Sequence, residues 1–190
     1  MIDTLAASMG LAASEPSFWM PLAFMLLLFL VIAAGTLLDG FDIGVGILVG
    51  IAPETERGRM MSLHSPWRDA NEFWLLLGLG LFAAAFPFAW GVVLGKLYGP
   101  LTLMVLGAML RSVAFEFRIR SVAANKPRWV WAFCLGSLMT AMGQGMALGR
   151  IATGYQTVAG YGWFAVFVGL CAVATYMLLG ATWLVMRVRG

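Results

Sequence analysis

The chain has 190 residues, of which 62% are hydrophobic and 11% charged, with a mean hydropathy of +0.90 and a formal charge of +3. This composition excludes an ordinary soluble domain. The sequence also has no basic stripe, phosphate loop or dinucleotide fingerprint, which argues against a nucleic-acid partner. It therefore predicts an all-α integral membrane protein.

Five apolar segments are long enough to cross a hydrocarbon core of about 30 Å, which takes roughly 20 helical residues. In chain order they cover residues 18–49, 73–93, 98–117, 129–148 and 163–186. Short connections between them predict an antiparallel transmembrane bundle of about five helices within a single domain, residues 18–190. Residues 1–17 lack the basic start of a secretory signal, so we expect them to form an N-terminal periplasmic segment.

The basic residues predict the orientation of this bundle. Nine lysines and arginines fall in the first and third connections and the C-terminal tail, against two in the second and fourth connections. Basic residues are enriched on the cytoplasmic side of membrane proteins. The N-terminus is therefore expected outside, in the periplasm, and the C-terminus in the cytoplasm.

Two carboxylates end the first apolar segment. Asp39 and Asp42 are three residues apart, so on a helix they share one face. Asp39 lies about 31 Å along a helix that starts at Phe18, near the cytoplasmic end. Charged side chains at membrane depth are costly and usually functional, facing the protein interior or a wet cavity.

Further charges are expected at the same membrane face. Asp69 and Glu72 begin the second segment, and Arg111 and Glu116 lie in the cytoplasmic part of the third. A cluster of acids around a buried cation can pass protons, whereas the alternative is ordinary interfacial charge. The candidate proton-pathway residues are Asp39, Asp42, Asp69, Glu72, Arg111 and Glu116. Trp67, Asn71 and Trp74 are candidates for a supporting role.

The remaining polar residues suggest no catalytic or metal site in this chain. His64 is the only histidine and is expected on the surface. It cannot supply paired axial haem ligands, although a methionine could complete a single site with it. Cys134 and Cys171 lack metal-type spacing and are expected to be buried free thiols. Gln144 either faces a cofactor or forms an interhelical hydrogen bond, and packing between helices is favoured.

Glycines at four-residue spacing predict close approach of the helix backbones, because no hydrophobic effect drives association within lipid. The expected packing stripes are Gly40/Gly44, Gly46/Gly50, Gly91/Gly95/Gly99 and Gly145/Gly149.

Four motifs carry a resemblance to a known family. They are LDGFDIGVGI at residues 38–47, WRDANEFWL at 67–75, LRSVAFEFR at 110–118 and GATWL at 180–184. Together they resemble the N-terminal half of subunit II of cytochrome bd quinol oxidases, with a leaning towards the cyanide-insensitive type. Glu116 stands where this family often has an aspartate.

This resemblance implies a multi-pass protein of the bacterial cytoplasmic membrane that acts only within a complex. The complex oxidises quinol and reduces dioxygen to water, with haem b558, haem b595 and haem d ligated mainly by a larger subunit I. Expected partners are subunit I, membrane lipids, and either a small accessory transmembrane subunit or a separate C-terminal half. The acids would then help deliver cytoplasmic protons. The alternatives are a stand-alone transporter or proton channel, and a purely structural assembly subunit.

Overall fold

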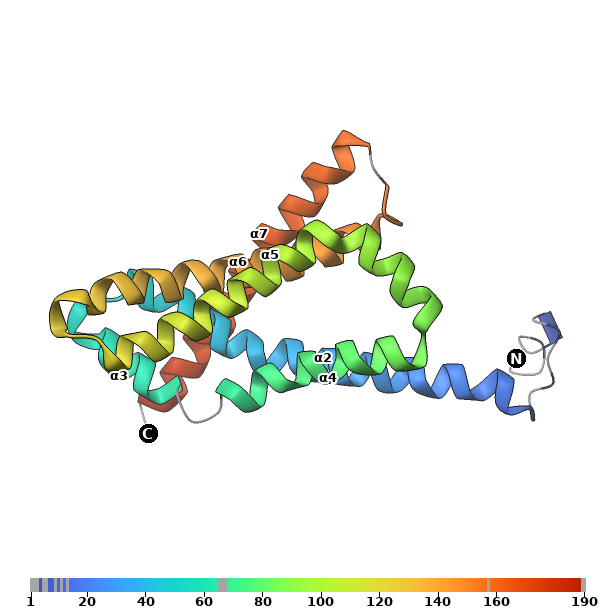
Figure 1. Ribbon diagram of the computed structural model, residues 1–190, viewed down its shortest axis with the longest axis horizontal. Coiled ribbons are helices and arrows are strands. Elements are labelled where there is room, and N and C mark those ends of the chain that lie inside the picture. The colour runs from blue at the N-terminus through green and yellow to red at the C-terminus, as the bar shows by residue number, and fades with distance from the viewer. Residues whose placement is uncertain are drawn as a thin grey trace.

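The computed structural model describes residues 4, 7–8, 10, 12, 14–64, 68–156 and 158–188, and within these ranges it is helical and contains no strand. Figure 1 shows the long helices arranged lengthwise, with α4 alongside α2 and α5 alongside α6. The helices are α2 (Pro16–Ile51), α3 (Glu54–His64), α4 (Arg68–Ala85), α5 (Pro87–Arg120), α6 (Lys126–Ala152) and α7 (Ala159–Val188), with a short 3₁₀ turn, η1 (Ala123–Asn125).

Three of these helices are long and apolar enough to cross a membrane: α2, α5 and α7. The 36 residues of α2 extend about 54 Å, well beyond a hydrocarbon core of about 30 Å. The prediction of a helical membrane protein is thereby confirmed. The number of five crossings and the orientation stay predictions.

The predicted boundary between the second and third segments is wrong. The sequence suggested a helix over residues 73–93 and a break near Gly95, but α4 ends at Ala85 and residues 87–93 belong to α5. The reason is Pro87, which suits the first turn of a helix and disfavours helical geometry at Phe86 before it. Helix α5 then continues through Gly95 and changes direction part-way along its length (Figure 1), with Pro100 inside it.

The first connection holds a helix of its own. Pro53 follows the end of α2, and Glu54 and Glu56 in the next turn favour a new helix N-terminus, α3. Arg57 of α3 folds back to α2: its Nε donates to the carbonyl oxygen of Ala52 at 2.9 Å. The guanidinium thus satisfies a carbonyl group that the end of α2 leaves without an intrahelical partner.

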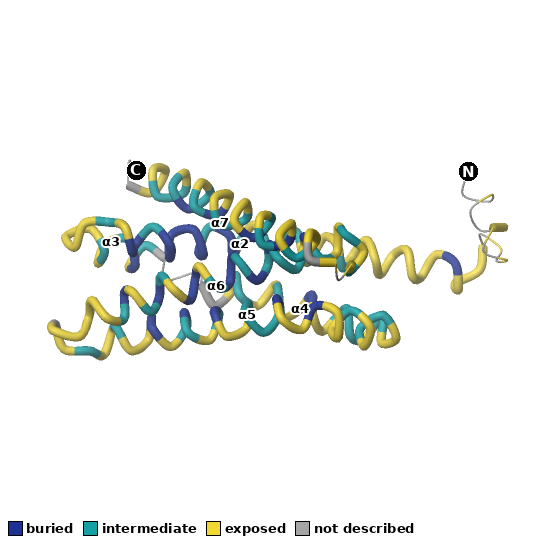
Figure 2. The backbone as a smooth tube through the Cα atoms, turned by 90° about the horizontal axis from the view of Figure 1, so that it is seen from above, coloured by how far each residue is buried: buried dark blue, intermediate teal, exposed yellow. Residues whose placement is uncertain are grey.

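Burial is concentrated at one end of the bundle, as Figure 2 shows for the C-terminal part of α2 and the adjoining helices. Ile43, Val49 and Phe133 are fully buried there, whereas Leu26 and Phe29 in the N-terminal half of α2 are exposed. Exposed apolar side chains at this density match a surface that faces hydrocarbon or another membrane subunit.

The free thiols only partly match expectation. Cys134 is half-buried, but Cys171 is exposed, so the prediction of two buried thiols is wrong for Cys171. Cys171 lies within an apolar helix, where the sequence alone does not distinguish a side chain facing the bundle from one facing outwards.

Glycines bring α2 and α7 into contact. A side chain on Gly44 would overlap the carbonyl oxygen of Tyr176, and one on Gly180 would overlap the backbone of Gly44 and Val45. The two helices therefore cross backbone against backbone at Gly44 and Gly180, as small residues permit in membranes.

The other glycine stripes divide into packed and open ones. Gly46 and Gly50 face α6, and Gly145 and Gly149 face α7. Gly91, Gly95 and Gly99 were predicted to pack as well, but no atom of another described helix lies within 4 Å of the position that a side chain would take, so this prediction is wrong. They lie in the first part of α5, whereas α5 meets α6 through a set not predicted from spacing: Gly107, Gly136 and Gly143.

A matched pair of glycine substitutions tests the α2–α7 crossing. We expect Gly180→Ala to lower the free energy of unfolding by about 1–3 kcal/mol, since an added methyl group forces two backbones apart. Gly95→Ala, also inside a helix but facing open space, should leave stability unchanged or slightly raise it. Denaturant titration in mild detergent micelles measures both. Equal effects of the two substitutions would contradict the crossing.

Candidate functional site

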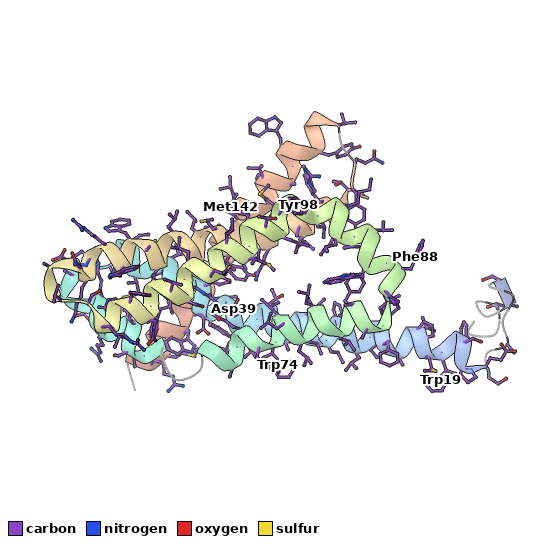
Figure 3. All side chains as sticks on the ribbon, viewed as in Figure 1. Trp19, Asp39, Trp74, Phe88, Tyr98 and Met142 are labelled. Atoms are coloured by element: carbon purple, nitrogen blue, oxygen red, sulfur yellow. The ribbon has the colours of Figure 1, made fainter. Side chains whose placement is uncertain are left out.

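A buried arginine joins three helices. Nη2 of Arg111 in α5 donates to Asp39 Oδ1 of α2 at 2.6 Å and to Glu72 Oε1 of α4 at 2.7 Å. We call these three residues the charge cluster. Arg111 is 0% exposed and Asp39 2%, whereas Glu72 keeps 25% of its side chain exposed. Figure 3 shows Asp39 at the level where α2, α4 and α5 come together.

Local packing positions the three groups. Gly35, one turn before Asp39, leaves room for α4: a side chain there would come within 3.1 Å of Trp74 Cβ. Because α4 lies this close to α2, Glu72 near its start reaches the same arginine as Asp39. Ser112 adds a weaker contact, since its hydroxyl lies 3.4 Å from Glu72 Oε2.

A second polar pair lies one helical turn from the charge cluster. Nδ2 of Asn71 donates to Asp42 Oδ2 at 2.7 Å, again between α4 and α2. Asp42 is buried, so the amide compensates part of the cost of removing this carboxylate from water. The predicted shared face of Asp39 and Asp42 therefore meets two consecutive polar residues of α4.

The charge cluster is not neutral when both of its acids are ionised. One guanidinium faces two carboxylates, which leaves a formal charge of −1 that one added proton removes. Nε and Nη1 of Arg111 are also buried and have no hydrogen-bond partner among the described residues. Buried polar groups of this kind are normally satisfied by protein or ordered water. The arrangement can thus hold a proton and bind water.

The predicted site residues do not all join the cluster. Glu116 is 50% exposed and pairs with Arg120 one turn away on α5, not with Arg111. Five residues separate Arg111 from Glu116, which places them on different sides of the helix. Trp67 and the side chain of Asp69 lie outside the described residues. Trp74 contributes through its packing at Gly35.

One interhelical pair extends beyond the predicted list. Tyr176 Oη donates to Gln144 Oε1, which joins α7 to α6. The sequence suggested an interhelical hydrogen bond for Gln144 but did not identify the residue that forms it. Among the described residues, no group of three or more His, Cys, Asp and Glu side chains is placed to hold a metal ion.

Comparison with known proteins identifies the family. A sequence model for cytochrome bd terminal oxidase subunit II matches residues 20–190. The chain belongs to this family. It is 39% identical over 108 residues to cytochrome bd ubiquinol oxidase subunit 2 of Bacillus subtilis, covering 54% of this chain and 31% of that protein. It is 27% identical over 172 residues to cytochrome bd-I ubiquinol oxidase subunit 2 of Escherichia coli K12, covering 80% of this chain and 45% of that protein.

A probable cytochrome oxidase subunit 2 of Haemophilus influenzae is 29% identical over 166 residues, which cover 78% of this chain and 44% of that protein. The chain thus spans less than half the length of these subunit II relatives. The resemblance predicted from the four motifs is confirmed, including its restriction to part of the subunit.

Two arginine substitutions test the energetics of the charge cluster. Arg111→Gln removes a buried cation that faces two carboxylates, so we expect the free energy of unfolding to fall by about 3–5 kcal/mol. Arg120→Gln breaks an exposed pair with Glu116 on the same helix, which should cost less than about 1 kcal/mol. Denaturant titration in detergent gives both values. A loss at Arg111 no larger than at Arg120 would contradict the buried ion pairs.

Proposed function

We propose that this chain acts as a subunit II component of a cytochrome bd-type quinol:oxygen oxidoreductase in the bacterial cytoplasmic membrane. In this role it stabilises the haem-bearing subunit and helps deliver cytoplasmic protons for the reduction of oxygen to water. The chain is not catalytic alone. The membership in the family and the buried charge cluster support this proposal.

The order of exposure within the charge cluster supports a direction for the proposed proton transfer. Glu72 is partly exposed near the start of α4, the end of that helix expected to face the cytoplasm, so in this proposal it takes up the proton. Arg111 contacts both acids through one nitrogen and holds their oxygens close together. Asp39 is buried and receives the proton from Glu72. The cluster has one carboxylate more than its cation neutralises, so a single added proton makes it electrically neutral.

The partners and cofactors follow from the same proposal. Haem ligation requires histidine, methionine, cysteine or tyrosine axial ligands. This chain has a single histidine, His64, at the end of the short helix α3, so it cannot supply histidine ligands to several haems. We therefore place haem b558, haem b595 and haem d in subunit I, with quinol as the substrate of the complex. No step proposed here runs through those haems.

A structural role is the second candidate, because the charge cluster itself supports it. α4 and α5 pack little against each other directly. Arg111 of α5 nevertheless binds Glu72 of α4 as well as Asp39 of α2. The same three residues could therefore hold the helices together for assembly with subunit I without passing protons.

Purification of the complex tests the assignment to the oxidase. We expect this chain, extracted from its native membrane in mild detergent, to bring down a larger subunit and to show haem absorption. The absorption spectrum and mass spectrometry of the co-purifying chains measure this. A haem-free preparation without a larger partner would contradict the proposal and favour a stand-alone transporter or channel.

Amide substitutions test the proton pathway itself. Asp39→Asn and Glu72→Gln preserve side-chain size but cannot carry a proton, so we expect quinol oxidase turnover per haem to fall by roughly one to two orders of magnitude. The matched control is Glu54→Gln on the exposed surface of α3, which should leave turnover unchanged.

Haem content separates the two candidate roles. Unchanged turnover per haem at unchanged haem content in both variants would overturn the pathway. Reduced haem content with unchanged turnover per remaining haem would favour the structural role. Loss of turnover with full haem content supports proton delivery.

A further inference from the structure

A second buried polar group lies next to the charge cluster. The hydroxyl of Tyr176 in α7 donates its only proton to Gln144 Oε1 in α6. Tyr176 is 5% exposed, so this contact lies inside the bundle. Since the donor of the phenol is occupied, its oxygen presents only lone pairs to any other group nearby.

The α2–α7 crossing places Tyr176 against the helix turn that carries Asp39. Gly44 and Gly180 bring the two backbones together, and the Tyr176 ring then covers Gly40, where a side chain would come within 2.8 Å of Cε1. Gly40 is the neighbour of Asp39 in the chain. The tyrosine is therefore the polar group that α7 contributes beside this carboxylate.

Gln144 carries a buried group that needs a ligand. Its Nε2 atom is inaccessible to solvent and has no hydrogen-bond partner among the described residues. Leaving a buried N–H donor unsatisfied is costly, and ordered water is the usual partner in such positions. A water molecule there can accept from Nε2 and donate to the Tyr176 oxygen, and one of its lone pairs stays free.

Gln144 lies level with Asp39 across the bundle. Gly46 of α2 faces Ser137 of α6, and the two helices run in opposite directions. Asp39, seven residues before Gly46, is therefore level with Gln144, seven residues after Ser137. A proton passing from Asp39 to Gln144 thus moves across the bundle, from α2 towards α6.

We propose that Gln144 and Tyr176 bind an ordered water molecule beside Asp39 and that this water accepts the proton from Asp39. The inference rests on the proposed function, because it extends the same pathway. In the transfer, the O–H bond of protonated Asp39 breaks as a new O–H bond forms on the water. The water then releases another of its protons towards the site where dioxygen is reduced to water. Gln144 and Tyr176 are positioning residues, since they hold the carrier and do not themselves gain or lose a proton.

Variants of the two positioning residues test the inference in the assembled oxidase. Tyr176→Phe keeps the ring against Gly40 and removes only the hydroxyl, and Gln144→Met keeps the length of the side chain and removes the amide. We expect each to lower turnover per haem about tenfold, as losing one well-placed hydrogen bond predicts. The apparent KM for quinol should not change, and the solvent isotope effect in D2O should rise. The control is Tyr161→Phe, a more exposed tyrosine on the same helix.

Two further results decide the inference independently of protein yield. Tyr176→Phe added to Asp39→Asn should cause no further loss of turnover, because both act on one transfer. A cryo-electron microscopy map of the unmodified complex that resolves water should show one within hydrogen-bond distance of Gln144 Nε2. An apolar contact at that atom, or full turnover in both positioning variants while Asp39→Asn is impaired, would overturn the inference and leave the proposed function standing. Full turnover in Asp39→Asn would instead overturn the proposed function.

Discussion

The arrangement of this protein depends on a guanidinium group that has been removed from water. A buried arginine is stable only if carboxylates compensate its charge at short range. Arg111 finds Asp39 and Glu72 at 2.6 and 2.7 Å, and each acid comes from a different helix. Three helices must therefore meet at one depth, and small residues in the adjacent helix turns permit this close approach. The same contact also leaves one carboxylate more than the cation balances, and the proposed proton transfer rests on this excess.

Glycine determines how closely the helices approach the charge cluster. A side chain on Gly136 would come within 2.6 Å of the backbone nitrogen of Arg111, so α6 lies directly against the helix turn that carries the arginine. Gly35 does the same for α4 at the turn before Asp39, and Gly44 for α7 after it. In lipid, such close packing replaces the hydrophobic effect as the force that holds helices together. The close helix packing at these glycines therefore brings the charged side chains within ion-pairing distance.

The candidate site was predictable from sequence where a charge stands in an apolar segment. Asp39 and Arg111 were identified because burying an unpaired charge is costly, and a partner is then required. Glu116 lies at a similar depth in the sequence pattern, but its side chain points to the surface of α5, where it pairs with Arg120. The Tyr176–Gln144 contact had no such signal, because tyrosine and glutamine are common in apolar helices and these two residues lie 32 positions apart in the chain. Likewise, the glycine stripe of residues 91–99 has the ideal spacing, yet packs against no neighbour in the described structure.

Composition, segment length and motifs were sufficient to establish a helical membrane protein of the cytochrome bd subunit II family, because bilayer thickness and the cost of exposed backbone polar groups permit few alternatives. The positions of the helix ends depended on local chemistry, as Pro87 shows at the start of α5. The pairing of charges and the choice of packed glycines emerged only from the folded chain. Both depend on the rotation of each helix about its own axis, which is determined by neighbouring helices that are distant in sequence.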